Sequence, residues 1–364
     1  MPLTGDQRDF GTRAAARRGL SLGLAALLLL AATLSGCDRS VSTSQPAPAG
    51  ELHRVKYSRE VMGTLAAVTA LAADEATARA AVEAAYARLA DVNRLMSDYV
   101  ADSEIGRINQ LPAGGSLVVS PETCTCLAQA LSVAERSGGA FDVTCRPLVS
   151  LWKQAGRQQR LPTDAELAEV RRRVGWQQVR LDPETRTVTI AAAGVQVDLG
   201  GIAKGFALDL AAAAMRSAGA ASGLVDVGGD IVTFGPRADG TQWRIGVRHP
   251  FRDGLLTELL LTDAAVATSG LQQRFHEIDG QRYSHIVDPR TGWPVREAPS
   301  VTVVAAAGAT ADAWATVFSV LTVAEGQALL AEPDAPPVEV MWITGDRSAP
   351  VIDQTSGFGR HIAP

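Results

Sequence analysis

Asp312 and Thr316 carry side chains that together could bind a metal ion. They lie four residues apart in a stretch predicted to be helical, so they share one face of the helix. A carboxylate and a hydroxyl can hold a hard cation such as Mg²⁺, which takes oxygen ligands and bridges phosphates. The spacing by itself favours a simpler interpretation, in which Asp312 caps the helix and Thr316 faces solvent or bonds back to the chain.

A second group of functional side chains lies in the string DLGGIAKGFALD, residues 198–209. Gly200 and Gly201 precede a predicted helix, where backbone N–H groups can approach an anion. Lys204 falls in the first turn, where the helix dipole disfavours a cation, so a nearby phosphate would offset its charge. The alternative is an ordinary turn before a helix with a solvated lysine, and this string by itself favours neither interpretation.

Two further stretches contain candidate functional groups. Phe141 and Asp142 follow a pair of glycines and could border a cleft that binds a ring, although an ordinary loop is the simpler interpretation. His285 lies between a predicted strand and an Asp-Pro turn. A histidine there can act as a general base at neutral pH. A histidine that only holds the turn is the simpler interpretation of that stretch.

Helices and strands alternate irregularly along the chain. The periodicity of apolar residues and the capping signals predict helices over residues 74–96, 120–136, 163–174, 201–217, 312–321 and 324–330. Strands are predicted within 55–71, with a break at Gly63, and over 179–181, 187–190, 223–227, 243–247, 256–261, 300–304 and 338–343. Because no regular βαβ rhythm is present, we expect an α+β fold or a mixed sheet packed with helices.

The composition is that of an ordinary globular protein. The 364 residues are 46% hydrophobic and 20% charged, with a formal net charge of -5. One large domain over residues 52–364 fits this length, and two closely packed subdomains would fit it as well. The mildly acidic balance argues against nucleic acid as a partner, because neutralising phosphates requires a basic face.

The N-terminus has the pattern of an export signal. Arginines precede an uncharged apolar run over 19–34, and Leu34-Ser35-Gly36-Cys37 resembles a bacterial lipobox. We therefore expect a signal peptide over 1–36, lipidation of Cys37 and a flexible tether over 37–51. This predicts a lipid anchor on the periplasmic face of the inner membrane. A plain signal peptide or a signal anchor is the alternative, and the export route stays open.

The remaining cysteines are Cys124, Cys126 and Cys145. Their number is odd, and one residue between the first two gives poor geometry for a mutual disulfide. No histidine has zinc-type spacing with them. We expect buried apolar thiols.

Together, and in this order, the strings resemble the family of FAD:protein FMN transferases, known as ApbE. The resemblance covers about residues 61–343. It rests on Met62-Gly63-Thr64, Ser97-Asp98-Tyr99, Gly139-Ala140-Phe141-Asp142, the string over 198–209, Gly228-Gly229-Asp230, Thr268-Ser269-Gly270, Ser284-His285-Ile286-Val287-Asp288-Pro289 and Asp312 to Thr316.

The resemblance implies an ApbE-like α+β fold with a T-fold-like core and an enzyme that uses FAD as substrate. It implies Mg²⁺-dependent transfer of FMN to a Thr or Ser of a subunit in a membrane redox complex, with release of AMP. Matching positions for the FAD site are Met62, Tyr99, Ala140, Phe141, Asp142, Asp198, Lys204 and Ile286. Gly201, through its carbonyl, Asp312 and Thr316 match metal positions, and His285 matches a residue proposed for catalysis.

Two other functions remain open at this point. The same site could hydrolyse FAD to FMN and AMP, with water in place of the protein hydroxyl. A lipoprotein that binds FAD without catalysis is the other alternative. The presence of Lys204 and of the Asp312 and Thr316 pair argues against it.

Overall fold

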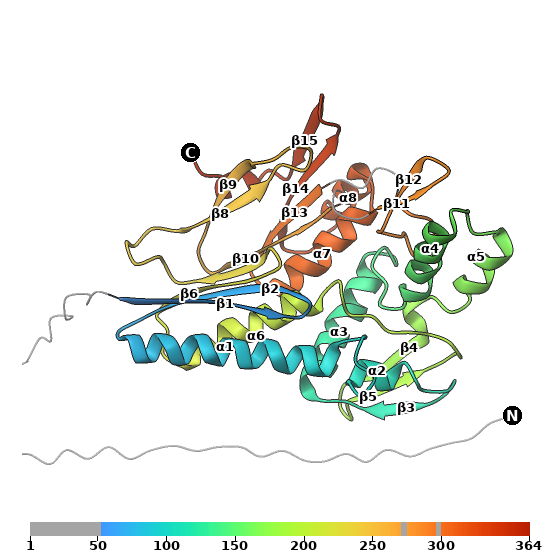
Figure 1. Ribbon diagram of the computed structural model, residues 1–364, viewed down its shortest axis with the longest axis horizontal. Helices are drawn as coiled ribbons and strands as arrows, with labels where there is room; N and C mark the ends of the chain where they lie inside the picture. The colour runs from blue at the N-terminus through green and yellow to red at the C-terminus, as the bar shows by residue number, and fades with distance from the viewer. Residues whose placement is uncertain (1–51, 271–274, 296–299) are drawn as a thin grey trace, which may run out of the picture. The chain divides into compact units, whose positions relative to one another are not determined.

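The computed structural model describes residues 52–270, 275–295 and 300–364, which Figure 1 shows in colour. The predicted signal peptide over 1–36, lipidated Cys37 and the tether over 37–51 lie outside the described residues. No helix within the described ranges is long and apolar enough to cross a membrane.

The centre of the fold is an eight-stranded sheet in which each strand pairs antiparallel with its neighbours. Its order is β1 (His53–Val61), β2 (Thr64–Ala72), β6 (Ser222–Val227), β7 (Asp230–Phe234), β10 (Ala264–Ser269), β13 (Ser300–Ala305), β14 (Val338–Gly345) and β15 (Pro350–Gln354). Alternate residues of each strand face opposite sides, so both faces of the sheet can be covered.

Helices cover one face of this sheet (Figure 1). They are α1 (Glu75–Met96), α3 (Pro121–Arg136), α6 (Ala203–Ser217) and α7 (Gly308–Val320). Their apolar sides pack with strand residues such as Val68 and Val225 in the largest core cluster. The two-stranded ribbon of β8 (Trp243–Arg248) and β9 (Leu255–Leu261) packs against the other face of the sheet. Sheet residues such as Leu71 and Val266 join it in a second core cluster.

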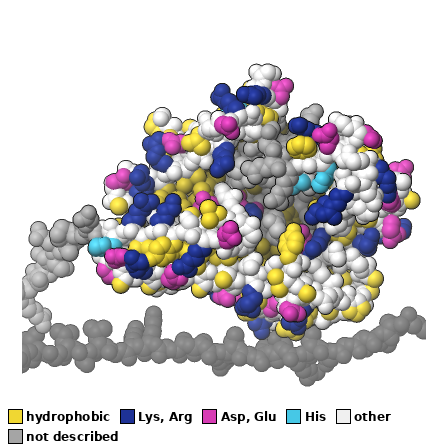
Figure 2. Space-filling view, in the orientation of Figure 1, with side chains coloured by type: hydrophobic (Ala, Val, Ile, Leu, Met, Phe, Trp, Pro, Cys, Tyr) yellow, Lys and Arg dark blue, Asp and Glu magenta, His cyan; other side chains and the backbone are white. Residues whose placement is uncertain are grey.

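Smaller elements complete the fold. One three-stranded sheet has the order β3 (Ser116–Val118), β5 (Thr187–Ile190), β4 (Val179–Asp182), and β11 (Phe275–Ile278) pairs with β12 (Gln281–Ser284). The other helices are α2 (Glu104–Ile108), α4 (Arg146–Gln158), α5 (Asp164–Arg171), α8 (Val323–Leu330) and the 3₁₀ helices η1 (Trp176–Gln178) and η3 (Phe358–His361). Figure 2 shows acidic and basic side chains interspersed over one face, which therefore presents no large field of one sign.

The predicted α+β class is confirmed, and the predicted helices and strands occur with small shifts of their ends. The largest shift is in α7, which begins at Gly308, four residues before the predicted start. The strand predicted before His285 is β12, whereas the sequence did not predict α2, α4, β3, β7, β10, β11 or β15. The three described cysteines are free. Cys124 and Cys126 are buried, as expected, whereas Cys145 is only half-buried.

Candidate active site

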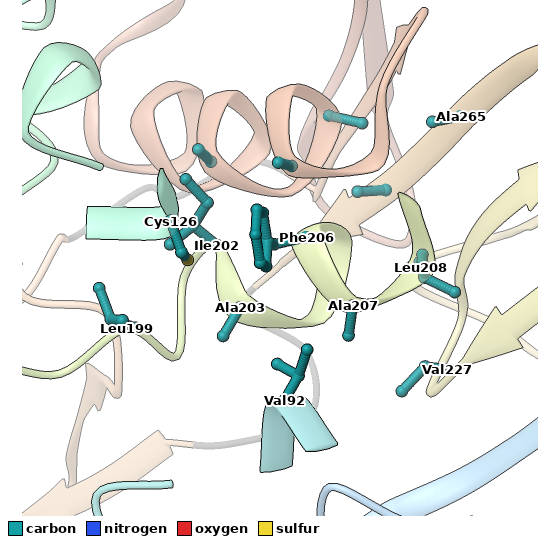
Figure 3. Close-up of a cluster of buried hydrophobic side chains, with 14 of the residues drawn as sticks. Val92, Cys126, Leu199, Ile202, Ala203, Phe206, Ala207, Leu208, Val227 and Ala265 are labelled. Atoms are coloured by element: carbon teal, nitrogen blue, oxygen red, sulfur yellow. The ribbon is translucent and has the colours of Figure 1, made fainter. Parts of the chain in front are cut away.

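Helix α6 carries several candidate residues at its start, and its neighbours fix it in place. Figure 3 shows Phe206 pointing from α6 towards α7, while Ala203 and Ala207 face Val92 of α1 on the other side. All four side chains are buried. The small alanines let α6 and α1 approach closely, because only methyl groups separate the backbones.

Helices α6 and α7 touch backbone to backbone at Gly205 and Gly308. A Cβ on Gly205 would lie 2.1 Å from the carbonyl oxygen of Gly308, and one on Gly308 would lie 2.5 Å from that of Gly205. No real Cβ comes so close to an oxygen, so glycine is required on both sides. This contact sets the distance between the first turns of the two helices.

Lys204 lies between two carboxylates. Its Nζ donates to a carboxylate oxygen of Asp230 and lies 3.4 Å from Oδ1 of Asp312. Burial alone would lower the pKa of Lys204, but the charges of Asp312 and Asp230 outweigh it and raise that pKa. Burial and the nearby Asp312 raise the pKa of Asp230 to about 6, although Lys204 opposes the rise. The amine is therefore a fixed positive charge at neutral pH.

This pairing changes the argument that the sequence offered for Lys204. One of the two interpretations left open by the sequence was that a cation in the first turn indicates an external anion such as phosphate. Asp230 and Asp312 already offset the charge, so the position of Lys204 does not by itself require a phosphate. A lysine held by protein carboxylates can still bind a phosphate oxygen, because the ammonium group has three donors.

Asp312 is buried within α7 and does not cap its own helix, so the simpler interpretation given above is wrong. Its Oδ2 instead accepts the backbone N–H of Gly205 at 3.0 Å, which caps the start of α6. Asp209 of α6 does the same for α7, since its carboxylate accepts from the N–H groups of Gly308 at 2.6 Å and Ala309 at 2.9 Å. We call these contacts the reciprocal cap.

The three predicted metal positions lie where α6 begins against α7. A Cβ on Gly201 would lie 3.2 Å from Oγ1 of Thr316, and Thr316 is one turn after Asp312 on the same helix. A carbonyl, a carboxylate and a hydroxyl are all hard oxygen ligands, so this set fits Mg²⁺. Among the described residues, no three His, Cys, Asp or Glu side chains gather to form another kind of metal site.

Phe141 and Asp142 belong to the same neighbourhood. A Cβ on Gly201 would lie 2.9 Å from the ring of Phe141. The carboxylate of Asp142 accepts from the N–H groups of Thr144 at 2.7 Å and Trp176 at 2.9 Å, and burial raises the pKa of Asp142. Ala140 beside them is buried. This loop is therefore held rigidly against the start of α6.

A cavity of about 360 Å³ opens beside Asp142. Its lining consists of Gly138, Gly139, Asp142, Val174, Gly175, Trp176, Gln177, Pro289 and Arg290. The volume lies within the range typical of ligand pockets. The structure thus brings the Asp142 loop and the Asp-Pro turn after His285 to one cavity, although they are far apart in the sequence.

Asp198 and Tyr99 border this neighbourhood from another side. Oδ1 of Asp198 accepts the N–H of Gly200 at 2.7 Å and so holds the turn before α6. Burial, together with the charge of Asp198, raises the pKa of Asp98. Arg146 pairs with Asp98 and lies over the ring of Tyr99, 5.7 Å from its centroid. The side chain of Tyr99 is 89% exposed.

The other predicted site residues lie on turns. Met62 and Gly63 form the two-residue turn of the β1–β2 hairpin with φ values of 52° and 70°, an unusual conformation for methionine. His285 is half-buried just after β12, and Ile286 packs against the main core cluster. The roles of all the site residues stay predictions.

Sequence reasoning assigned no role to Asp230 and Asp209. Both stand in the quoted strings, Asp230 after Gly228-Gly229 and Asp209 at the end of the lysine string. An aspartate that follows glycines is a weak indication of function. Its partner could not be named, because Lys204 and Gly308 are distant in sequence from these carboxylates.

Comparisons with known proteins identify the family of this chain. The sequence profile of the ApbE family matches residues 62–342. An FAD:protein FMN transferase of Vibrio cholerae serotype O1 is 35% identical over 338 residues, which cover 90% of this chain and 95% of that protein. A protein of the same name from Treponema pallidum is 34% identical over 322 residues, with 82% and 88% covered.

Solved structures show the same similarity. The flavin transferase ApbE from Vibrio cholerae aligns with a TM-score of 0.75 and 32% identity, covering 85% of this chain and 99% of that one. The ApbE protein from Thermotoga maritima aligns with a TM-score of 0.76 and 30% identity, covering 86% and 100%. The chain therefore belongs to the ApbE family, and the predicted family, fold class and class of enzyme, a flavin transferase, are confirmed.

Proposed function

We propose that this chain cuts FAD and transfers the FMN half to the hydroxyl of a protein Thr or Ser, with Mg²⁺ bound and AMP released. The similarity to FAD:protein FMN transferases supports the substrate. The observation that carries the proposal is the junction of α6 and α7, where Lys204 and Gly201 meet Asp312 and Thr316. A cation and a lysine at one place suit a diphosphate.

In this mechanism the chain holds and orients the diphosphate. Gly201, Asp312 and Thr316 would bind Mg²⁺, which when present stabilises the charge that develops on the departing AMP. Lys204, held by Asp230, binds a phosphate oxygen. Phosphoryl transfer depends mainly on positioning and electrostatics, so no covalent intermediate with the enzyme is needed.

Transfer of FMN forms one bond to phosphorus and breaks another. The acceptor hydroxyl oxygen forms a bond to the phosphorus of the FMN half, and the bond from that phosphorus to the bridging oxygen breaks. The bridging oxygen leaves with AMP. His285 takes the hydroxyl proton as general base. Met62, Tyr99, Ala140, Phe141, Asp142, Asp198 and Ile286 line the FAD site in this proposal.

Incubation with FAD, Mg²⁺ and a flavin-carrying subunit of a membrane redox complex tests this function. Transfer predicts that the acceptor gains FMN, seen by mass spectrometry, together with an equal amount of AMP. Free FMN and AMP with an unmodified acceptor would instead establish hydrolysis. Bound FAD with no AMP under any condition would establish the binding protein.

His285→Ala in the same assay tests the general base. The variant should bind FAD normally and transfer FMN about 100-fold or more slowly, because a positioned base contributes on that order. Its loss of rate should shrink as the pH rises and hydroxide replaces the missing base. A rate equal to that of the wild type would remove His285 from the mechanism.

The proposed place of action is the periplasmic face of the inner membrane, with a lipid on Cys37 after removal of residues 1–36 and with 37–51 as tether. The lipobox-like Leu34-Ser35-Gly36-Cys37 supports this. A Cys37→Ser variant should leave the membrane fraction while its domain keeps FMN transfer in solution. Fractionation that finds the variant still membrane-bound would contradict the lipid anchor.

A further inference from the structure

Asp209 is a half-buried carboxylate that lies outside the candidate metal set. It accepts two hydrogen bonds from the first two N–H groups of α7, at 2.6 and 2.9 Å. The residue before these amides, Ala307, has no side chain that could cap the helix. Asp209 is therefore the described side chain that satisfies both amides, and its charge suits the positive end of the helix dipole.

The two amide contacts partly oppose the effect of burial on Asp209. Burial raises the pKa of Asp209, and the hydrogen bonds from Ala309 and Gly308 offset only part of that rise. The direct backbone contact of Gly205 and Gly308 leaves the two helices no room to move closer. A loss of the amide contacts would therefore let α7 tilt or slide at its first turn.

Such a movement would reach the candidate metal set within one or two turns. Asp312 is four residues and Thr316 eight residues after Gly308, all on one side of α7. Gly201 lies in the turn just before α6. Mg²⁺ requires near-ideal octahedral geometry with ligands at about 2.0–2.1 Å, so a small displacement of one helix along the other changes its affinity.

We propose that Asp209 is a positioning residue for the metal site. It touches neither the ion nor FAD, and it fixes the register of α7 on α6 so that Gly201, Asp312 and Thr316 meet. The other half of the reciprocal cap, in which Asp312 accepts from Gly205, fixes the same register from the side of α7. The inference rests on the proposed function, because it assumes that these residues bind a divalent cation.

The test measures the affinity for Mn²⁺ alone, by the electron paramagnetic resonance signal of the free ion, together with FAD affinity without metal. Asp209→Ala should weaken Mn²⁺ binding about 10- to 100-fold, the loss typical of groups that orient metal ligands. FAD affinity should stay within about twofold. Asp209→Asn keeps one acceptor oxygen for the amides and should lose less.

Asp74→Ala is the matched control. Asp74 caps α1 by accepting the N–H of Thr77 at 2.7 Å, so this cap is local to α1 and joins neither α6 nor α7. This variant should lower the thermal midpoint and leave Mn²⁺ affinity unchanged. If Asp74→Ala weakened Mn²⁺ binding as much as Asp209→Ala, general loss of stability would explain both and the positioning role would be overturned.

The remaining outcomes separate this inference from the proposed function. A wild-type protein that binds no Mn²⁺ would contradict the proposed metal dependence itself. A wild-type protein that binds Mn²⁺, with Asp209→Ala and Asp209→Asn binding it equally well, would overturn the role of Asp209 alone. If Asp209→Ala does not fold, Asp209→Asn carries the test with the same expected direction.

Discussion

Two pairs of helices in this protein begin in different ways. α5 and α8 each start with a capping box, Thr163 with Glu166 and Thr322 with Glu325, in which the partners are three residues apart. The N-cap residues of α6 and α7 are Ile202 and Ala307, and neither makes a side-chain cap. The reciprocal cap satisfies their first amides from carboxylates 107 and 99 residues away.

The two kinds of cap differ in the structural feature that each one fixes. A local capping box stabilises a helix wherever that helix lies, because both partners move with it. A cap from another helix stabilises the start and also fixes the position of one helix relative to the other. The candidate metal set lies between α6 and α7, at the place where relative position matters.

Asp312→Ala should have the largest effect, because it removes a proposed metal ligand and half of the reciprocal cap. Transfer of FMN, measured as mass gain of the acceptor, should fall at least about 100-fold. The free N–H of Gly205 should cost about 1–3 kcal/mol of stability. Asp312→Asn separates the two effects: it should keep most of the stability and still lose transfer.

Thr322→Ala is the local counterpart, since it removes the cap of α8. It should cost about 1 kcal/mol of stability and leave transfer unchanged. Normal transfer by Asp312→Ala, with Mg²⁺ as the only metal, would contradict the metal assignment. Equal losses of transfer in Thr322→Ala and Asp312→Ala would contradict the claim that only the reciprocal cap supports the site.

Gly205→Ala should have an intermediate effect. Alanine improves helix propensity by about 1 kcal/mol, but a Cβ 2.1 Å from the oxygen of Gly308 forces the backbones apart. The steric effect outweighs propensity, so we expect a net loss of about 1–3 kcal/mol in chemical denaturation and weaker Mn²⁺ binding.

Gly156→Ala in α4 sharpens this prediction. Its Cβ would lie 2.9 Å from the Cβ of His276 in β11, so this variant also introduces a clash, but one away from the contact of Gly205 with Gly308. We expect a loss of stability of similar size and no change in metal affinity. A Gly205→Ala variant as stable as the wild type would show that the helices are not held at a fixed distance.

Glu166→Gln should have the smallest effect. The side chain of Arg160 and the N–H of Thr163 lower the pKa of Glu166 to about 2. A lowered carboxyl pKa gives stability that is present above the unfolded-state pKa of about 4.3 and is lost as the pH falls towards 2. The thermal midpoints of variant and wild type should therefore differ slightly at pH 7, approach each other below about pH 4 and converge only near pH 2 or below, with transfer unaffected at pH 7. A difference in thermal midpoint that grows as the pH falls would contradict the lowered pKa of Glu166.

Contacts between neighbours in the sequence could be predicted, whereas contacts between distant residues could not. The capping box Thr163–Glu166 was visible because its partners are neighbours in the chain, and the helix periodicity of α1 and α6 was visible for the same reason. The start of α7 was predicted four residues late, because its cap comes from Asp209. The pairing of Asp230 with Lys204 needed the fold, since only the sheet brings β7 to the start of α6.

The resemblance to the family named site residues that spacing could not. Asp312 and Thr316 by themselves favoured a cap, and Gly201 has no side chain to suggest a ligand. Their meeting at the start of α6 is a property of helix packing around Gly205 and Gly308. Long-range contacts of this kind leave no periodic pattern in a single sequence.

The central claim is that a divalent cation binds where α6 begins against α7. The most direct measurement is a crystal of the protein grown with FAD and Mn²⁺, with the ion located by its anomalous scattering. The account predicts one peak within about 2.5 Å of the carbonyl of Gly201, the carboxylate of Asp312 and the hydroxyl of Thr316. A peak bound elsewhere, with FAD in place and this junction holding only Lys204, would contradict it.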